Sequence, residues 1–265
     1  MKEFRLIGRD IDYSLSPAIH NYIFKLNNIS ARYDIMNLKN QKEISHVISM
    51  IRDGKIHGLN VTVPYKKNII DHLDKIDNKS KQINAINCVS TNINKSIIGY
   101  NTDWLGFKKF LQANNIDLAN KDIKIIGNGG ASKAVQYVLR SMNMCKVNIY
   151  VRGNKNNDHK NLVDLYNDID DNSIIINATP YHFINMDQNI SDKFITTNCM
   201  WIDLLYTKLS TSILKKMEIS RYFNGIDMLI FQAIASQDIW FRNNIAEIVN
   251  LDDIKMYLNK DYNVK

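Results

Sequence analysis

Short apolar runs alternate along the chain with stretches that place an apolar residue at every third or fourth position, so strands and helices are expected in turn. In the first hundred residues the runs predict strands at residues 3–8, 31–37, 56–61, 86–91 and 96–99. Helices are expected around residues 44–51 and after Ser16-Pro17, with Ser16 as the N-cap and Pro17 at the first helical position. This β-α-β-α-β order favours a mainly parallel sheet.

A second unit of the same type begins near Asp103. The pattern predicts a helix at residues 104–113, a strand at 122–126, a glycine turn, a helix at 131–142 and a strand at 147–152. Strands at 173–176 and 200–204 extend the sheet, and helices at 227–241 and 251–258 follow. We therefore predict an α/β protein with two domains. Residues 1–102, completed by C-terminal helices in 227–265, form a mixed or parallel α/β domain, and residues 103–226 form a Rossmann-like domain.

Composition narrows the class of protein. With 45% hydrophobic and 23% charged residues, the 265-residue chain is expected to be globular. No apolar run approaches the length of a membrane span, and the N-terminus has no signal-peptide pattern. The three cysteines lack a C-x-x-C spacing and the six histidines lack a ligand spacing. We expect a cytoplasmic protein without disulfides, metal or membrane contact.

The basic balance of the chain raises the possibility of nucleic-acid binding. Lysine and arginine number 34 and aspartate and glutamate 27, which gives a net charge of +7. However, the basic residues are spread along the chain, with no run of five and no interleaved aromatic face. A solvated basic surface is the better interpretation, and no nucleic-acid partner is expected.

The glycine turn is the first candidate for chemistry. It consists of Gly127, Asn128, Gly129, Gly130 and Ala131, between a predicted strand and a predicted helix. Glycines let a backbone approach a pyrophosphate closely, and a helix N-terminus offers free N–H donors. The alternative is a tight turn without a ligand.

The end of the next strand indicates which dinucleotide would bind. Its sequence is Val151, Arg152, Gly153, Asn154 and Lys155, with two cations and no acidic residue. NAD sites usually place an acid here for the ribose hydroxyls, whereas an arginine can pair with a 2′-phosphate. The sequence therefore favours NADP, unless Arg152 is simply a surface cation.

Three polar clusters in the first domain could bind a substrate. Ser14 and Ser16 place two hydroxyls at the mouth of a helix, which suits a carboxylate, although Ser16 could also be an ordinary cap. Lys66 follows a proline turn, where a solvated lysine is the usual finding, and Asp103 could be no more than an N-cap. Reduction of a ketone needs a proton donor for the developing alkoxide, and a lysine held beside an aspartate can supply it.

Taken in order, these segments resemble the shikimate dehydrogenase family over about residues 5–240. The matching motifs are Ser14-Leu15-Ser16-Pro17-Ala18-Ile19-His20-Asn21, Asn60-Val61-Thr62-Val63-Pro64-Tyr65-Lys66, Ala85-Ile86-Asn87, Asn101-Thr102-Asp103, Gly127 to Ser132, Asn177-Ala178-Thr179, and Gly225 with Met228-Leu229 and Gln232-Ala233. The resemblance implies NADPH-dependent reduction of 3-dehydroshikimate to shikimate, in the pathway to chorismate and the aromatic amino acids.

The resemblance also implies roles for individual residues. Lys66 and Asp103 would form the catalytic pair. The carboxylate of the substrate would be bound by Ser14, Ser16 and Tyr206, and its ring hydroxyls by Thr62, Asn87, Gln232 and the catalytic pair. The cofactor would contact the loop 127–131 and residues 151–155, with Leu204 and Gly225 near the nicotinamide, in a cleft between the domains.

Several positions depart from the usual family pattern. Asn128 stands where alanine is common, Val151 and Gly153 flank Arg152 where asparagine and threonine are usual, and Trp104 replaces a glycine. These changes affect expected cofactor affinity more than reaction type. Two alternatives stay open: a dehydrogenase that also accepts quinate, and a relative that binds nucleotide or metabolite without catalysis. The protein is expected to be a monomer or a homodimer.

Overall fold

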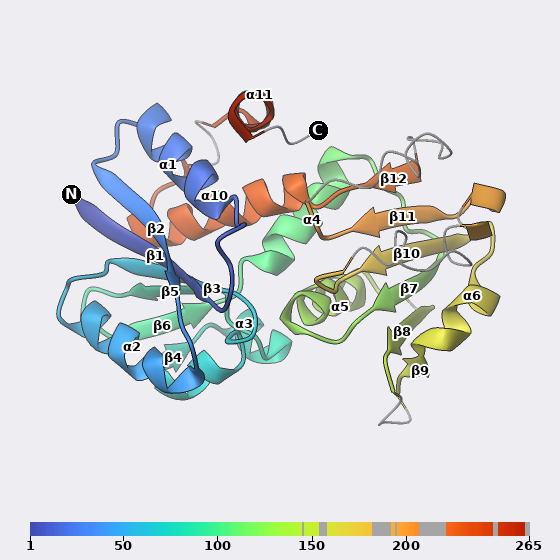
Figure 1. The fold of residues 1–265 in the computed structure, drawn as a ribbon, viewed down its shortest axis with the longest axis horizontal. Coiled ribbons are helices and arrows are strands. Elements are labelled where there is room, and N and C mark those ends of the chain that lie inside the picture. Colours follow the sequence, from blue (N-terminus) through green and yellow to red (C-terminus); the bar gives the residue numbers. More distant parts are fainter. Residues whose placement is uncertain are drawn as a thin grey trace. The chain divides into compact units, whose positions relative to one another are not determined.

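The computed structural model describes residues 1–144, 146–153, 158–181, 192–193, 195–206, 221–245 and 249–262. These residues form two compact units (Figure 1). Unit 1 comprises Met1–Phe110 and Leu229–Asn263, and unit 2 comprises Leu111–Met228 with the last two residues of the chain. The divisions fall within the helices α4 (Asp103–Ala113) and α10 (Ile226–Phe241). Each unit contains one sheet of six strands among the described residues, which confirms the predicted α/β class.

The sheet of unit 1 has the strand order β2-β1-β3-β5-β6-β4. Its strands and helices are β1 (Lys2–Gly8), α1 (Ser16–Leu26), β2 (Ala31–Asn37), α2 (Ile44–Arg52), β3 (Gly58–Val61), β4 (Lys75–Ile76), α3 (Asn78–Ile83), β5 (Cys88–Thr91), β6 (Ile97–Tyr100) and α11 (Leu251–Tyr262). The sheet is mixed: β5 runs antiparallel to both β3 and β6, and the other five strands run in one direction, as the mainly parallel prediction requires. Only five residues separate β5 from β6, too few for the crossover that a parallel pair needs.

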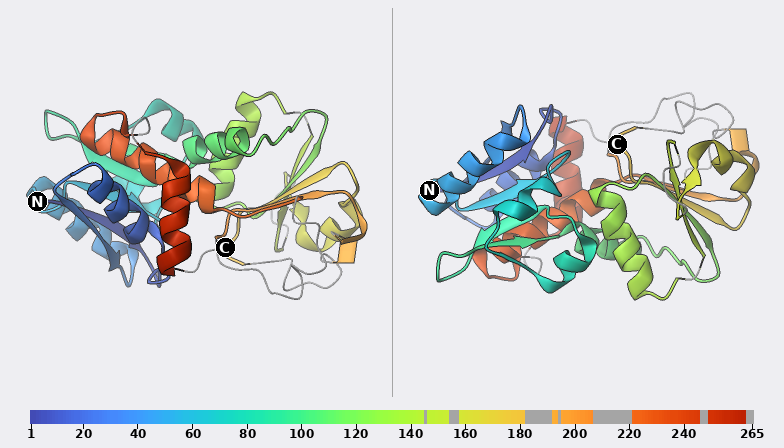
Figure 2. Two further views of the ribbon diagram at one scale, coloured as in Figure 1. Left: turned by 90° about the horizontal axis from the view of Figure 1, so that it is seen from above. Right: turned by 90° about the horizontal axis from the view of Figure 1, so that it is seen from below.

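The two faces of this sheet pack against different helices. Successive residues of a strand point to opposite faces, so Phe4 and Leu6 join one cluster of buried residues and Ile7 another. The first cluster includes Phe24 of α1 and Trp240 of α10, and the second includes the apolar stripe of α2. α11 lies beside α1 (Figure 2). Tyr22 of α1 stacks on Tyr257 of α11 with ring centroids 4.1 Å apart.

The start of α1 differs from the prediction. The N-cap is Leu15, without a side-chain capping bond, so Ser16 and Pro17 occupy the first helical positions. The expectation that Ser16 is the N-cap was wrong. The backbone N–H of Ser16 donates to Ser14 Oγ (3.2 Å), so the upstream hydroxyl already binds an amide at this helix end.

The sheet of unit 2 is parallel throughout, in the order β12-β11-β10-β7-β8-β9. Its elements are β7 (Asp122–Ile126), α5 (Gly130–Ser141), β8 (Val147–Val151), β9 (Lys160–Asn161), α6 (Leu165–Asp168), β10 (Ser173–Asn177), β11 (Met200–Asp203) and β12 (Tyr222–Phe223). The strands of two residues, β4, β9 and β12, were not predicted, since so short a run carries no periodicity. The carboxyl ends of β7, β8, β10 and β11 form one edge, where ligands of such sheets bind.

Candidate active site

Lys66 and Asp103 form a partly buried ion pair in unit 1. Lys66 lies in the loop after β3, beyond the cis peptide bond between Val63 and Pro64, and Asp103 is the first residue of α4. Lys66 Nζ is 2.7 Å from Asp103 Oδ2, and the two side chains are 15% and 8% exposed. The lysine is thus not the solvated side chain that its loop position alone would suggest. An ammonium and a carboxylate so placed offer a proton donor and a proton acceptor at one point.

Asn87, immediately before β5, binds the second oxygen of Asp103. Its Nδ2 donates to Asp103 Oδ1 at 2.7 Å and to Thr102 Oγ1 at 2.9 Å, and its Oδ1 accepts from the Thr102 backbone N–H at 2.6 Å. The two oxygens of the Asp103 carboxylate therefore bond Lys66 and Asn87. Asn101 Oδ1 accepts the N–H of Trp104 in that turn (3.3 Å).

Gln232 of α10 reaches the same cluster. Its Oε1 lies 3.4 Å from Asn87 Nδ2 and its Nε2 donates to the carbonyl of Leu229 at 2.9 Å. The structure therefore brings together four residues that the sequence nominated from well-separated segments. These are Lys66, Asn87, Asp103 and Gln232.

Further buried polar groups join this cluster without having been assigned a role from the sequence. They are Tyr33, Asn60, Thr102 and Ser236. Asn60 and Thr102 lie inside motifs that the sequence analysis quoted, so adjacency to the predicted residues was the available signal. No sequence signal pointed to Tyr33 or Ser236, because a tyrosine in a strand and a serine in an apolar helix are both common.

The remaining substrate candidates of unit 1 lie outside the hydrogen bonds of this cluster. Ser14 and Ser16 bond one another through their hydroxyls at 3.2 Å. Ser16 is 6% exposed and Ser14 is half-buried. Thr62 follows β3, where its N–H donates to Ile7 and its carbonyl accepts from Tyr65. Two hydroxyls at one helix end match the donor set that a carboxylate needs.

In unit 2, the glycine turn joins β7 to α5 as predicted. Gly127 has φ +96°, a conformation that L side chains rarely adopt, and a Cβ there would lie 2.7 Å from Thr179 Cγ2. Gly129 is the N-cap of α5, and the space around its Cβ position is open to 4 Å. Gly130 and Ala131 begin the helix, whose first N–H groups have no intrahelical acceptor. The turn thus fits the pyrophosphate of a dinucleotide.

Residues at the carboxyl end of β8 flank this turn. Val151 ends the strand, and Arg152 and Gly153 follow it at exposed positions. The Arg152 guanidinium lies over the ring of Tyr181, 5.2 Å from the centroid, and Asn128 Nδ2 is 3.1 Å from His159 Nε2. Two predicted cofactor residues, Asn154 and Lys155, lie outside the described residues.

Beyond β11, Leu204 and Gly225 approach each other closely. The N–H of Gly225 donates to Leu205 O at 2.7 Å, and a Cβ on Gly225 would collide with the carbonyl of Leu204. Leu204 itself donates to the carbonyl of Asn177 at the end of β10 (3.0 Å). Tyr206 follows on the same segment and is half-buried. Only glycine fits at position 225, which explains this residue of the quoted motif.

Two titratable groups near the cluster in unit 1 are held neutral. Burial raises the pKa of the Cys88 thiol to about 12 and lowers the pKa of His20 to about 3. Neither side chain offers an ionised group to a ligand at neutral pH. Among the described residues there is no group of three His, Cys, Asp or Glu side chains placed to hold a metal ion, and no helix has the length and apolarity needed to cross a bilayer.

A parallel sheet with a glycine turn for a pyrophosphate, and a separate unit with a partly buried Lys–Asp pair, define the class of two-domain, dinucleotide-dependent oxidoreductases. Residues 6–89 match the family model of the shikimate dehydrogenase substrate binding domain. The chain is 38% identical over 252 residues to a shikimate dehydrogenase (NADP(+)) of Clostridium botulinum, covering 91% of this chain and 96% of that protein. The chain belongs to the shikimate dehydrogenase family.

More distant relatives agree with this assignment. The protein of the same name from Caldicellulosiruptor bescii is 32% identical over 95% of this chain and 91% of its own length. The crystal structure of shikimate dehydrogenase 1 from Peptoclostridium difficile matches with a TM-score of 0.79 and 31% identity, covering 98% of this chain and 97% of that one. The family resemblance drawn from the sequence is confirmed, and the NADP(+) in the relatives' name agrees with the predicted cofactor.

Proposed function

We propose that this protein reversibly reduces 3-dehydroshikimate to shikimate with NADPH, and that Lys66 and Asp103 are its catalytic pair. The observation that carries the proposal is the ion pair of 2.7 Å between these side chains, inside the unit that matches the family's substrate binding domain. A structural ion pair would also be buried, but it would not need Asn87 to bond Asp103, or Gln232 to lie beside Asn87.

The substrate is an anion with several ring hydroxyls, and the candidate residues suit both features. Ser14, Ser16 and Tyr206 would bind its carboxylate through hydroxyl donors. Thr62, Asn87 and Gln232, with the catalytic pair, would bind the ring oxygens. Asn87 Oδ1 keeps a second lone pair and Gln232 Nε2 a second hydrogen, and each suits a hydroxyl group.

The glycine turn and the end of β8 would hold the cofactor. Gly127, Asn128, Gly129, Gly130 and Ala131 would surround the pyrophosphate at the N-terminus of α5. Val151, Arg152, Gly153, Asn154 and Lys155 would surround the adenosine 2′-phosphate. Leu204 and Gly225 would contact the nicotinamide. When bound, NADPH supplies the hydride that converts the ketone to an alcohol.

Lys66 would deliver the proton that completes this reduction. As the ketone carbon accepts the hydride, negative charge develops on its oxygen, and the Lys66 ammonium can transfer a proton to that oxygen. Asp103 would hold the ammonium in place and bind a neighbouring ring hydroxyl. In the reverse direction the neutral amine would take the hydroxyl proton of shikimate.

The functional domains are residues 1–102 with 227–265 for the substrate and residues 103–226 for NADP. The protein acts in the cytoplasm, which suits two free buried cysteines, Cys88 and Cys199. It acts as a monomer or a homodimer, which sedimentation can distinguish.

The test is the loss of NADPH absorbance when pure protein receives 3-dehydroshikimate, with 3-dehydroquinate and NADH in parallel. Turnover of 3-dehydroshikimate alone supports the proposal. Comparable turnover of 3-dehydroquinate would indicate an enzyme for both quinate and shikimate. Binding of NADPH without turnover would overturn the proposal in favour of a non-catalytic relative.

A further inference from the structure

We infer that Ser236 and Thr102 are positioning residues, which fix the orientation of Asn87 and, through it, of the Asp103 carboxylate. This inference rests on the proposed function, because it assigns Asp103 to catalysis. Neither residue was given a role by the sequence. Both are completely buried in unit 1, on α10 and directly before α4.

The orientation of the Asn87 amide is the first step. A backbone N–H can only donate, so the atom of Asn87 that faces the Thr102 N–H at 2.6 Å is Oδ1. Nδ2 then points to the other side, with one hydrogen for Asp103 Oδ1 (2.7 Å) and one for Thr102 Oγ1 (2.9 Å). Asp103 is left with Oδ2 for Lys66. A rotated amide would instead aim an oxygen at the carboxylate, which is repulsive.

The hydroxyl of Thr102 is directed by Ser236. The carbonyl of Gln232 only accepts, so the single hydroxyl proton of Ser236 is donated there, at 2.9 Å. Thr102 is then the donor across the 3.1 Å to Ser236 Oγ, which is nearer to its hydroxyl than the two other acceptors, Asn87 Oδ1 at 3.3 Å and Gln232 Oε1 at 3.5 Å. Thr102 Oγ1 then presents lone pairs to Asn87 Nδ2. The hydrogen bonds run in one direction from Asn87 through Thr102 and Ser236 to the backbone of α10, and such chains strengthen each member.

Asn60 anchors Ser236 from the opposite side. Its Nδ2 donates to Ser236 Oγ at 3.0 Å and to the Asn87 carbonyl at 2.9 Å, and its Oδ1 accepts from Tyr33 OH at 2.9 Å. Both hydrogens and the oxygen of this buried amide are bonded, so its orientation is also fixed. The network thus links the sheet, α10 and the predicted catalytic aspartate of unit 1.

The experiment compares Thr102→Val, Thr102→Ser and Ser236→Ala in the full-length enzyme. Valine has the shape of threonine without the hydroxyl, and serine keeps the hydroxyl without the methyl group. We expect Thr102→Val and Ser236→Ala to lower kcat for shikimate oxidation about 3- to 10-fold, the size of one lost neutral hydrogen bond. KM for NADP(+) should not change. Thr102→Ser should retain most of the kcat.

The two deletions should not be independent of each other. Both interrupt one chain of hydrogen bonds, so Thr102→Val combined with Ser236→Ala should lose little more than either alone. If the fold-decrease in kcat of the double variant equals the product of the two single decreases, the inference is overturned. Thr102→Val is isosteric, so it keeps the test valid if Ser236→Ala folds poorly.

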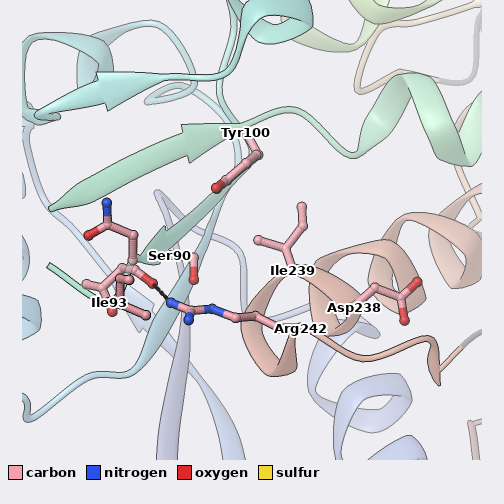
Figure 3. Close-up of a pocket in the computed structure, with 8 residues that line it drawn as sticks. Ser90, Ile93, Tyr100, Asp238, Ile239 and Arg242 are labelled. Carbon is pink, nitrogen blue, oxygen red and sulfur yellow. Dashed lines mark hydrogen bonds between the residues drawn. The ribbon is translucent and has the colours of Figure 1, made fainter. Parts of the chain in front are cut away.

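Ser90→Ala is the matched control. Ser90 is also a buried serine of unit 1, at 6% exposure, but it lines a separate pocket of about 330 Å³ with Tyr100, Ile239 and Arg242 (Figure 3). In that pocket the Arg242 guanidinium donates to the carbonyl of Thr91 at 3.2 Å. Ser90→Ala should keep the kcat of the unmodified enzyme.

Two results would contradict the inference. One is unchanged kcat in both Thr102→Val and Ser236→Ala, and the other is an equal loss in Ser90→Ala. Parallel assays of Lys66→Ala separate this failure from a failure of the proposed function. If Lys66→Ala remains fully active, the catalytic pair is wrong. If Lys66→Ala is inactive while the two deletions are active, only the positioning role is wrong.

Discussion

Lys66 occupies a loop position that is usually solvated, yet Asp103 and the surrounding chain reduce its exposure to 15%. At the scale of single residues, we expect Lys66 and Arg152 to affect activity most specifically.

Lys66→Ala should lower kcat about 10²- to 10⁴-fold and raise KM for shikimate much less. A group that acts on the developing alkoxide contributes mainly in the transition state, and loss of acid–base catalysis costs a factor of this size. Steady-state kinetics with shikimate and NADP(+) measure both constants. Lys67→Ala, one residue further along the chain, is the control. A near-normal kcat in Lys66→Ala would exclude this lysine from the mechanism.

Arg152→Ala should reduce the preference for NADPH over NADH, mainly by raising KM for NADPH. An arginine can bind a phosphate through two charge-assisted hydrogen bonds. NADH lacks the 2′-phosphate, so its KM should not depend on Arg152. The ratio of kcat/KM for the two cofactors is the measurement. Arg140→Ala removes an equal charge from the last turn of α5 and should leave the ratio intact. Equal kcat/KM for both cofactors in the unmodified protein would refute the assignment.

At the scale of elements, the turn between β7 and α5 depends on a backbone conformation. Gly127 has φ +96° and a close neighbour in Thr179, whereas Gly129 has φ −81° and open space. Two glycines only two residues apart therefore serve different needs: Gly127 lets the chain turn, and Gly129 leaves room at the helix N-terminus.

Gly127→Ala should destabilise unit 2 by about 1–3 kcal/mol, because a left-handed conformation and a contact of 2.7 Å both penalise a Cβ. Gly129→Ala should change the free energy of unfolding by less than about 0.5 kcal/mol, as substitutions without a steric or polar conflict usually do. Denaturant unfolding without cofactor gives both values. Equal stability of the two variants would show that the turn tolerates a side chain at position 127.

At the scale of the whole molecule, a buried histidine links stability to pH. His20 is completely buried in unit 1, stacked on Tyr33 with ring centroids 4.1 Å apart, and its Nδ1 lies 3.0 Å from Gln237 Nε2. Because burial lowers its pKa to about 3, the unfolded chain binds a proton at this residue at a higher pH than the folded protein does.

The contribution of His20 to the free energy of unfolding should therefore have its full value above about pH 6.5. It should decrease as the pH drops toward 3, by up to about 5 kcal/mol. The carboxylates of Asp74, Asp168 and Asp170, whose pKa values are lowered by hydrogen bonds, add losses only below about pH 4. Unfolding of the protein and of His20→Gln between pH 7 and 5 isolates the histidine. A slope that persists in His20→Gln would contradict this origin.

The α/β alternation, the glycine turn and the motifs that identified the family can all be recognised in the amino-acid sequence. These features are local: the periodicity of β1 or α2, and the strict need for glycine at position 127, are visible in a few adjacent residues. The motifs also nominated Lys66, Asn87, Asp103 and Gln232 from segments up to 166 residues apart.

The contacts of those residues depend on how distant segments pack in the folded chain. The N-cap of α1 is Leu15 and not Ser16, whose N–H lies inside the helix start and donates to the Ser14 hydroxyl. The antiparallel β5 and the short strands β4, β9 and β12 depend on pairing with other strands, not on their own few residues. Ser236 acquires its place in the polar cluster from the way α10 packs against Asn60 and Thr102. Such contacts arise between distant segments. A hydrogen bond between distant segments produces no periodic pattern in the sequence, so the pattern cannot predict it.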